Sequence, residues 1–450
     1  MRPLFSPGAQ AHAKHASVPG RSGAPAPRVP AGAGPAYIPS RMSPETLTFG
    51  CRLNAFESEA MRALAAQAGL TDALIVNTCA VTAEAEAQAR QAIRRAARAA
   101  PGRPILVTGC AAQIAPEAWA GLPGVARVIG NADKLRPEAW RVPMPLSDVM
   151  QARDIPASPV VEMQGRARAF LQVQQGCDHR CTFCVIPYGR GPSRSLPMGA
   201  VVDQARAMVA AGVREIVLTG VDIASYGSDL PGTPRLGQLA RRLLAAVPEL
   251  PRLRLSSLDP AAIDADLWRL IESEPRFLPH LHLSAQHGAD LMLKRMKRRH
   301  SRADLLALVA QARALRPDIV FGADLIAGFP TESEADFVDL LSLVPEAGLT
   351  FLHVFPYSPR PGTPAARMPQ LPVALRRARA QALREAGRAA ARRFLESRLG
   401  QAEDVLMERN GRGHTAHFVP VRLAAPVAPG TLLRARACAI TDDALLVEAA

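Results

Sequence analysis

Short apolar runs alternate with helical patterns in the first third of the chain. Ala- and Arg-rich stretches of helical periodicity follow each run, and Asn54 with Glu57 fits a capping box at the start of the first helix. The pattern predicts a doubly wound α/β domain over residues 46 to 145. The runs that read as its buried strands are ETLTFGC (45 to 51), ALIVNTC (73 to 79) and PILVTGC (104 to 110).

A second series of strand-like runs begins after an irregular, Pro-containing linker over residues 143 to 167. Helical patterns separate the runs, including residues 198 to 211 and 301 to 315. Six βα units predict an open (β/α)6 barrel rather than a closed barrel of eight, with the strand ends lining one mouth. The six runs are AFLQVQQGC (169 to 177), EIVLTGVD (215 to 222), LRLSSLD (253 to 259), LPHLHLSAQ (278 to 286), IVFGADLIAGFP (319 to 330) and FLHVFPYSP (351 to 359).

The two ends of the chain have different patterns. Residues 371 to 399 predict one long helix rich in Arg, which closes a core of residues 163 to 399. Short strands with turns at Gly411, Gly413 and Gly430 then predict a small β-barrel over residues 400 to 450. Residues 1 to 45 are rich in Pro, Ala and Gly, and we expect a disordered extension, with Met42 as an alternative start.

Composition and charge narrow the class of protein. A chain of 450 residues suggests two or three domains, and it contains no apolar run long enough to span a bilayer. The net charge of +14 is typical of a protein that binds polyanions, although a generally Arg-rich proteome explains it equally well. Seven cysteines, an odd number, favour a reducing cytoplasm over a set of disulfides.

The cysteines form two groups of three. Cys51, Cys79 and Cys110 each end one of the first three strands, and parallel strands present these ends along one edge of a sheet. Three thiols should therefore converge there, as a metal site requires, whereas any one of them alone reads as a structural cysteine. Cys438 remains, and we expect a small buried side chain.

The second group, Cys177, Cys181 and Cys184, follows the first barrel strand directly. A tetrahedral zinc site needs a fourth protein ligand, and His179 lies at an unsuitable spacing within the loop. A 4Fe-4S cluster held by three thiolates leaves one iron open for a substrate or cofactor. The open iron accounts for the missing fourth ligand.

The CxxxCxxC loop, with Phe183 before its last cysteine, closely resembles the signature of radical S-adenosylmethionine enzymes. The resemblance implies that the cluster of Cys177, Cys181 and Cys184 binds S-adenosylmethionine and reduces it to a 5'-deoxyadenosyl radical, and that Phe183 covers the cluster. TFGCRLNAFESE, NTCAVT and VTGCAAQ resemble the cysteine segments of the methylthiotransferases. That family implies a second 4Fe-4S cluster on Cys51, Cys79 and Cys110 and a C-terminal TRAM module that binds RNA. The resemblance covers residues 45 to 447.

Three branches of this family differ in substrate: isopentenyladenosine in tRNA, threonylcarbamoyladenosine in tRNA, or an aspartate of a ribosomal protein. The isopentenyl branch is expected to carry a Leu-Gly-Gln-Asn turn where this chain has Thr219 to Asp222. The resemblance therefore implies methylthiolation of carbon 2 of threonylcarbamoyladenosine at position 37 of tRNA, with the other two substrates as alternatives. A non-catalytic iron-sulfur protein that binds RNA and a zinc-stabilised structural protein are more distant alternatives. The segments that resemble the threonylcarbamoyladenosine branch are CVIPYGRGPSRSLP, EIVLTGVDIASYG, LRLSSLDP and FLHVFPYSPRPGTPAARM.

Strand-end residues are candidates for contacts with S-adenosylmethionine. We expect Thr219 and Gly220 near its amino group, Ser256 and Ser257 near its ribose, and Gly328 near its adenine, although serines at strand ends also act as ordinary caps. Gln286 and His287 are equally ambiguous, and His282 reads as a satisfied core histidine.

The expected partners are the anticodon region of tRNA and a reductant such as flavodoxin or ferredoxin, with no sulfur donor indicated. The basic run 294 to 302 and the helix 371 to 399 could contact phosphates, although each alone reads as a solvated face. Phe418 and Tyr357 are the candidate platforms for base stacking.

Overall fold

The computed structural model describes residues 43–156, 166–423, 425 and 427–449. These residues belong to one compact unit. Most of the expected N-terminal extension, with Met42, lies outside the described residues, as does part of the 143–167 linker. Of the helices described, none has the length and apolar character needed to cross a membrane.

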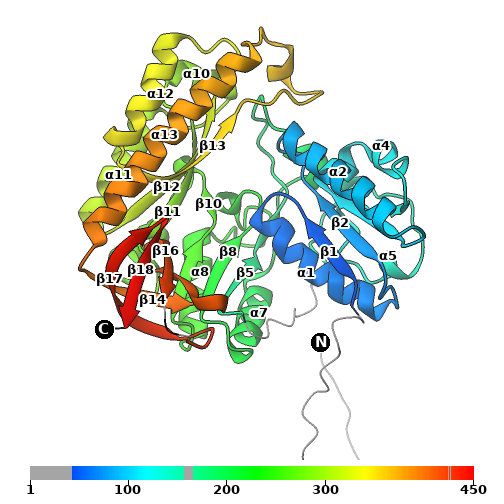
Figure 1. Cartoon of the computed structure of the whole chain (residues 1–450), viewed down its shortest axis with the longest axis horizontal. Coiled ribbons are helices and arrows are strands. Elements are labelled where there is room, and N and C mark those ends of the chain that lie inside the picture. The colour runs from blue at the N-terminus through cyan, green and yellow to red at the C-terminus, as the bar shows by residue number, and fades with distance from the viewer. Residues whose placement is uncertain (1–42, 157–165, 424, 426, 450) are drawn as a thin grey trace, which may run out of the picture. The chain divides into compact units, whose positions relative to one another are not determined.

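A four-stranded parallel sheet, in the order β1-β2-β3-β4, forms the first layer, and Figure 1 shows it in blue and cyan. Helices cover both faces, because side chains alternate along a strand: Ile75 packs under α1, whereas Leu74 and Val76 pack under α2. The three predicted strands are confirmed, and β4 is an addition. The elements are β1 (Glu45–Thr48), α1 (Arg52–Gln67), β2 (Leu74–Thr78), α2 (Ala83–Ala99), β3 (Ile105–Gly109), α3 (Cys110–Ile114), α4 (Pro116–Ala120), β4 (Val125–Val128) and α5 (Glu138–Arg141).

The expected capping box at Asn54 and Glu57 is wrong. Helix α1 begins at Arg52, with Cys51 as its N-cap, so both residues lie inside the helix and are buried. The Asn54 amide donates hydrogen bonds to the carbonyl oxygens of Phe49 (2.7 Å) and Thr78 (3.1 Å). These bonds tie the helix start to the ends of two strands.

The second sheet is the predicted open six-unit barrel. All its pairings are parallel, in two runs, β5-β8-β9 and β10-β11-β12-β13, which are joined where the Leu278 amide donates to the Leu253 carbonyl (2.9 Å). β5 and β13 are the two edges, so the barrel is open between them. The strands are β5 (Arg168–Gln172), β8 (Glu215–Thr219), β9 (Arg252–Leu255), β10 (Ser257–Leu258), β11 (His280–Gln286), β12 (Val320–Ala327) and β13 (Leu349–Pro356).

Seven longer helices accompany the barrel, and Figure 1 shows α13 running beside β13. Three predicted helices are confirmed as α7, α11 and α13. A short antiparallel pair, β6 (Gln174–Gln175) with β7 (Arg194–Ser195), flanks α6 (Ile186–Arg190) after the first strand. The longer helices are α7 (Met198–Ala210), α8 (Leu236–Ala246), α9 (Ala265–Ser273), α10 (Asp290–Met296), α11 (Arg302–Leu315), α12 (Glu334–Glu346) and α13 (Val373–Arg398).

The C-terminal strands form a closed five-stranded barrel in the order β14-β15-β16-β18-β17. Gly411 and Gly430 lie at turns with positive φ, as predicted, whereas Gly413 lies inside a strand. The expectation of a buried Cys438 is wrong, because alternation along β17 turns Ala437 inward and leaves Cys438 exposed. The strands are β14 (Ala402–Met407), β15 (Arg412–Thr415), β16 (Pro420–Leu423), β17 (Leu432–Thr441) and β18 (Ala444–Ala449).

Candidate active site

The first cysteine triad lies at one edge of the first sheet. Cys51 precedes α1, Cys79 follows β2, and Cys110 opens α3 directly after β3. Gly50 has a φ of +95°, and a Cβ there would lie 2.6 Å from the Cys79 sulfur. This glycine is therefore required for the close approach of the first two cysteine segments. Burial raises the pKa of Cys51 and raises that of Cys79 to about 12, and the nearby Cys110 adds to both shifts.

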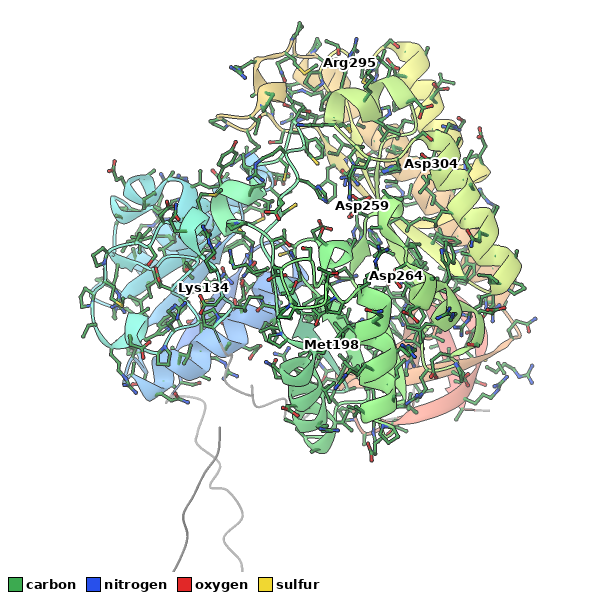
Figure 2. All side chains as sticks on the ribbon, turned by 180° about the vertical axis from the view of Figure 1, so that it is seen from behind. Lys134, Met198, Asp259, Asp264, Arg295 and Asp304 are labelled. Atoms are coloured by element: carbon green, nitrogen blue, oxygen red, sulfur yellow. The ribbon has the colours of Figure 1, made fainter. Side chains whose placement is uncertain are left out.

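A buried charged network lies beneath this triad. The Arg190 guanidinium donates to the Cys110 sulfur (3.1 Å) and to Glu57 Oε1 (2.7 Å), and also to Asn54. Lys134, labelled in Figure 2, donates to Glu57 Oε2 at 2.5 Å. Burial alone would raise the pKa of Glu57, but the charges of Arg190 and Lys134 outweigh it and hold this pKa at about 2. Glu57 is therefore a buried carboxylate shared by two cations.

The second triad lies on the loop that follows β6. The Thr182 amide donates to the Met296 carbonyl (3.2 Å), and the Thr182 carbonyl accepts from the Ala365 amide (2.9 Å), so both flanks fix the loop. Burial raises the pKa of Cys177 and of Cys184 to about 12. These thiols therefore need a bound cation to become thiolate ligands at neutral pH.

Arg298 donates a hydrogen bond to a sulfur of the second triad, as Arg190 does at the first triad. Its guanidinium donates to the Cys181 sulfur (3.7 Å) and pairs with Asp259 (3.1 Å), which is labelled in Figure 2. Each triad thus has one sulfur hydrogen-bonded by a guanidinium that a buried carboxylate holds. Phe183 packs edge-on against Phe329, with ring centroids 6.5 Å apart, beside the last cysteine of the loop.

Helix α6 connects the two triads. It begins two residues after Cys184, and its last residue is Arg190. A Cβ on Gly189 would lie 3.0 Å from the Cys110 Cβ, and the Asn131 amide donates to the Gly189 carbonyl (2.5 Å) and to the Cys110 sulfur (3.6 Å). The loop of one triad is therefore packed directly on a cysteine of the other.

The spacing of the thiols argues against a single ion in either triad. Zinc bound by sulfur at about 2.3 Å brings its ligand atoms to within about 4 Å of one another. Among the described residues, one group of His, Cys, Asp or Glu has three ligand atoms within 4.8 Å of one another, and it is His282, Asp324 and His353. Neither cysteine triad is that close, whereas a cluster of four irons accepts wider spacing.

The strand-end candidates lie where the barrel strands finish, as expected. Thr219 ends β8, Ser256 lies between β9 and β10, Ser257 begins β10, and Gly220 and Gly328 follow β8 and β12. The two glycines are also required by the local packing. A Cβ on Gly220 would lie 2.8 Å from the Gln174 carbonyl, and one on Gly328, where φ is +75°, would lie 2.6 Å from the Arg376 side chain. Contacts of the five with S-adenosylmethionine stay a prediction.

The histidine interpretations have clear outcomes. His282 is buried and bonded to Asp324 (2.9 Å), which confirms a satisfied core histidine. His287 is also buried, and its Nε2 lies 3.0 Å from a Glu332 oxygen. His287 is therefore structural, and Gln286 carries a positive φ at the end of β11.

The expected stacking platforms are not free surfaces. Tyr357 is buried, and the Phe418 ring stacks on His414 with centroids 4.9 Å apart. The exposed aromatic near the triads is instead Tyr188, on α6, at 51% exposure. Its position four residues after the last cysteine of the loop was the available signal.

The basic segments are partly occupied by intramolecular pairs. In the run 294–302, Arg298 and Arg299 both pair with Asp259. On α13, Arg379 is buried against Glu332, whereas Arg388 and Arg392 are exposed. Only the exposed part of each segment is available for phosphate contacts.

Comparisons with known proteins agree with this geometry. Residues 171–344 match the model of the Radical SAM superfamily, and residues 45–130 match Uncharacterized protein family UPF0004. A protein of Rickettsia prowazekii named threonylcarbamoyladenosine tRNA methylthiotransferase MtaB is 47% identical over 88% of this chain and 95% of its own. A Bacillus subtilis protein of the same name is 36% identical over 71% of this chain and 74% of its own.

Two further matches differ in name. A tRNA-2-methylthio-N(6)-dimethylallyladenosine synthase of Novosphingobium aromaticivorans is 36% identical over 83% of this chain and 89% of its own. Among solved structures, the radical S-adenosylmethionine methyltransferase TsrM of Kitasatospora setae is 18% identical over 70% of this chain and 68% of its own, with a TM-score of 0.48.

Proposed function

Because the chain belongs to the MtaB family of threonylcarbamoyladenosine tRNA methylthiotransferases, we propose that it attaches a methylthio group to carbon 2 of threonylcarbamoyladenosine at position 37 of tRNA. The observation that carries the proposal is the junction of the two triads, where α6 leads from Cys184 to the hydrogen bond between Arg190 and Cys110. A reaction that needs both a radical and a sulfur source requires two such sites beside one substrate.

We assign one cluster to each triad, Cys51, Cys79 and Cys110 to the first and Cys177, Cys181 and Cys184 to the second. The donor sets fit, since each triad offers three thiols and one guanidinium bonded to a sulfur. When bound, the second cluster supplies the electron that cleaves S-adenosylmethionine, and the first holds the sulfur to be transferred. Three thiol ligands in each triad would leave one iron of each cluster open to a further ligand.

The surrounding residues orient these ligands. Arg190 and Arg298 stabilise negative charge on one sulfur of each triad, while Glu57 and Asp259 fix the guanidinium groups. Thr182 anchors the loop of the second triad on both sides. The buried network therefore keeps the two triads at a constant separation.

We further propose three functional segments, residues 46–145 for the first cluster, 163–399 for the radical chemistry and 400–450 for RNA. A flavodoxin or ferredoxin would supply electrons, and work on tRNA places the enzyme in the cytoplasm. The dimethylallyladenosine synthase at 36% identity makes isopentenyladenosine the second candidate substrate.

The test uses the anaerobically reconstituted protein, S-adenosylmethionine and a chemical reductant. Two anticodon stem-loop RNAs of one sequence carry threonylcarbamoyladenosine or isopentenyladenosine at position 37. Mass spectrometry of the digested RNA should show the 2-methylthio product with the first RNA alone. Product from the isopentenyl RNA alone would contradict the assignment.

A further inference from the structure

One cation beside the first triad has no acceptor of its own. Arg52 follows Cys51 and opens α1, and its guanidinium carbon lies 5.4 Å from the centroid of the Phe418 ring. Within the described parts of the chain, Arg52 makes no hydrogen bond or ion pair. Arg190, Arg254 and Arg298, by contrast, all pair with carboxylates.

The neighbours of Arg52 increase the local positive charge. The guanidinium carbons of Arg168 and Arg254 lie 5.0 and 4.8 Å from the same ring centroid. Glu408 pairs with Arg168 (3.1 Å), and Glu215 pairs with both Arg252 and Arg254 (2.9 Å each), whereas no carboxylate of the described residues pairs with Arg52. Arg52 is charged at neutral pH, as a guanidinium group in a protein always is.

A polar wall faces this cation from the neighbouring strands. His282 on β11 and His353 on β13 each place a ring nitrogen on Asp324 Oδ1 of β12, at 2.9 and 3.1 Å. His353 is 54% exposed and lies on the edge strand at the open side of the barrel. The Phe418 ring connects this wall with the cation, because it lies 5.4 Å from the guanidinium carbon of Arg52 and 5.3 Å from the His280 ring, which in turn lies 6.5 Å from the His282 ring.

His280 is a further polar side chain beside the Phe418 ring. Its ring lies 5.3 Å from Phe418 and 6.5 Å from His282 between centroids. It is buried, and neither ring nitrogen has a hydrogen-bond partner among the described residues. An unpartnered buried imidazole is costly unless another polar group serves it.

We propose that Arg52 and His353 bind the carboxylate of the threonyl group on the substrate nucleoside, with Asp324 as a positioning residue for His353. The inference rests on the proposed function. Arg52 is adjacent in the chain to a ligand of the first cluster, so an anion bound by its side chain lies within one nucleoside's length of the sulfur. An isopentenyl group carries no charge and would leave the half-buried Arg52 without an anion, which is how the site would reject it.

His282, Asp324 and His353 could also hold a metal ion, since their ligand atoms lie within 4.8 Å of one another. Hydrogen bonds from the two imidazoles to one carboxylate oxygen already account for this geometry. The carboxylate receptor in addition explains Arg52, which a metal ion of like charge would repel. A metal at these residues is therefore an outcome of the test.

The test compares two stem-loop RNAs that differ in one group, the threonyl carboxylate or its neutral carboxamide. Wild-type protein, reconstituted but without S-adenosylmethionine, should bind the acid about 10 to 100 times more tightly than the amide, as a charge-assisted pair predicts. Arg52→Gln should lose this preference, Arg52→Lys should keep part of it, and His353→Asn should reduce it. The ratios of kcat/KM should follow the same order.

Arg62→Gln is the matched control, since Arg62 lies on the solvent side of the same helix and pairs with Glu59 alone. Each variant must contain as much iron as the wild type. If Arg52→Gln contains less, the preference of His353→Asn for the acid over the amide decides the test instead. Equal binding of acid and amide by a wild-type protein that still forms the methylthio product would overturn the receptor and leave the proposed function intact. No product from either RNA would overturn the proposed function. If the wild type contains a metal other than iron and His353→Asn does not, then His282, Asp324 and His353 form a metal site, and the carboxylate receptor is overturned.

Discussion

Arg190 donates a hydrogen bond of 3.1 Å to the sulfur of Cys110, although the two residues lie 80 positions apart and belong to different cysteine motifs. The same guanidinium is held by Glu57, which α1 contributes. One side chain thus connects the loop of the second triad with two segments of the first sheet.

Replacing Arg190 by Met should lower the free energy of unfolding by about 3–5 kcal/mol, because Glu57 would lose one of its two buried cations. The variant should also bind less iron at the first triad. Urea denaturation and iron analysis measure these effects. Arg180→Met is the control, since Arg180 is exposed and bonds only to backbone oxygens. A loss below about 1 kcal/mol would show that the network is not structural.

Glu57 should make stability depend on pH in acid. Its pKa is depressed to about 2 in the folded protein, so its contribution is fully present above the unfolded value near 4 and is lost as pH falls toward 2. The depressed pKa of Glu57 contributes about 3 kcal/mol to the free energy of unfolding at neutral pH. Unfolding measured from pH 7 to pH 3 should therefore lose stability more steeply in the wild type than in Glu57→Gln. Parallel curves would contradict the assigned charge state.

The two triads should be separable by mutation. Cys110→Ala should remove about four of about eight irons and abolish sulfur transfer, while reductive cleavage of S-adenosylmethionine continues. Cys184→Ala should abolish that cleavage. Cys438→Ala should change neither, because this thiol is exposed in β17. Cleavage that persists in Cys184→Ala would exclude the proposed radical site.

Phe418 should anchor the C-terminal barrel on the open barrel of six βα units. Phe418→Ala should cost about 2 kcal/mol and speed amide exchange in β15 and β16, since three guanidinium groups lose the ring they surround. Phe418→Leu separates apolar packing from the cation–π contacts, because leucine keeps apolar volume but has no aromatic face. Equal losses in both variants would assign the effect to the cation–π contacts.

The local patterns were sufficient for the main strands and helices and for both cysteine triads, but not for β4 or for the short β6–β7 pair. Strand ends carry Cys51, Cys79 and Cys110 at a regular spacing, and parallel pairing then makes their convergence a geometric consequence. The six βα units and the closed C-terminal barrel follow from the same periodicity. Element starts were less certain, as α1 shows by beginning at Arg52 rather than after Asn54.

The network around the triads could not be read from the chain. Arg190 meets Glu57 across 133 positions, and Arg52 lies near Asp324 across still more, so no local pattern contains either contact. Glu57 gave a misleading local signal, since an Asn and a Glu three residues apart also suit a capping box. The burial of Glu57 shows that it is a partner of Arg190 and Lys134 and not a helix cap, and this burial depends on the whole fold.

The central claim is tested most directly in cells that lack this gene. Mass spectrometry of their tRNA nucleosides should show that 2-methylthio-threonylcarbamoyladenosine is lost and its unmodified precursor accumulates, and that wild-type protein but not Cys184→Ala restores the product. Loss of 2-methylthio-isopentenyladenosine, with the threonylcarbamoyl form intact, would contradict the account.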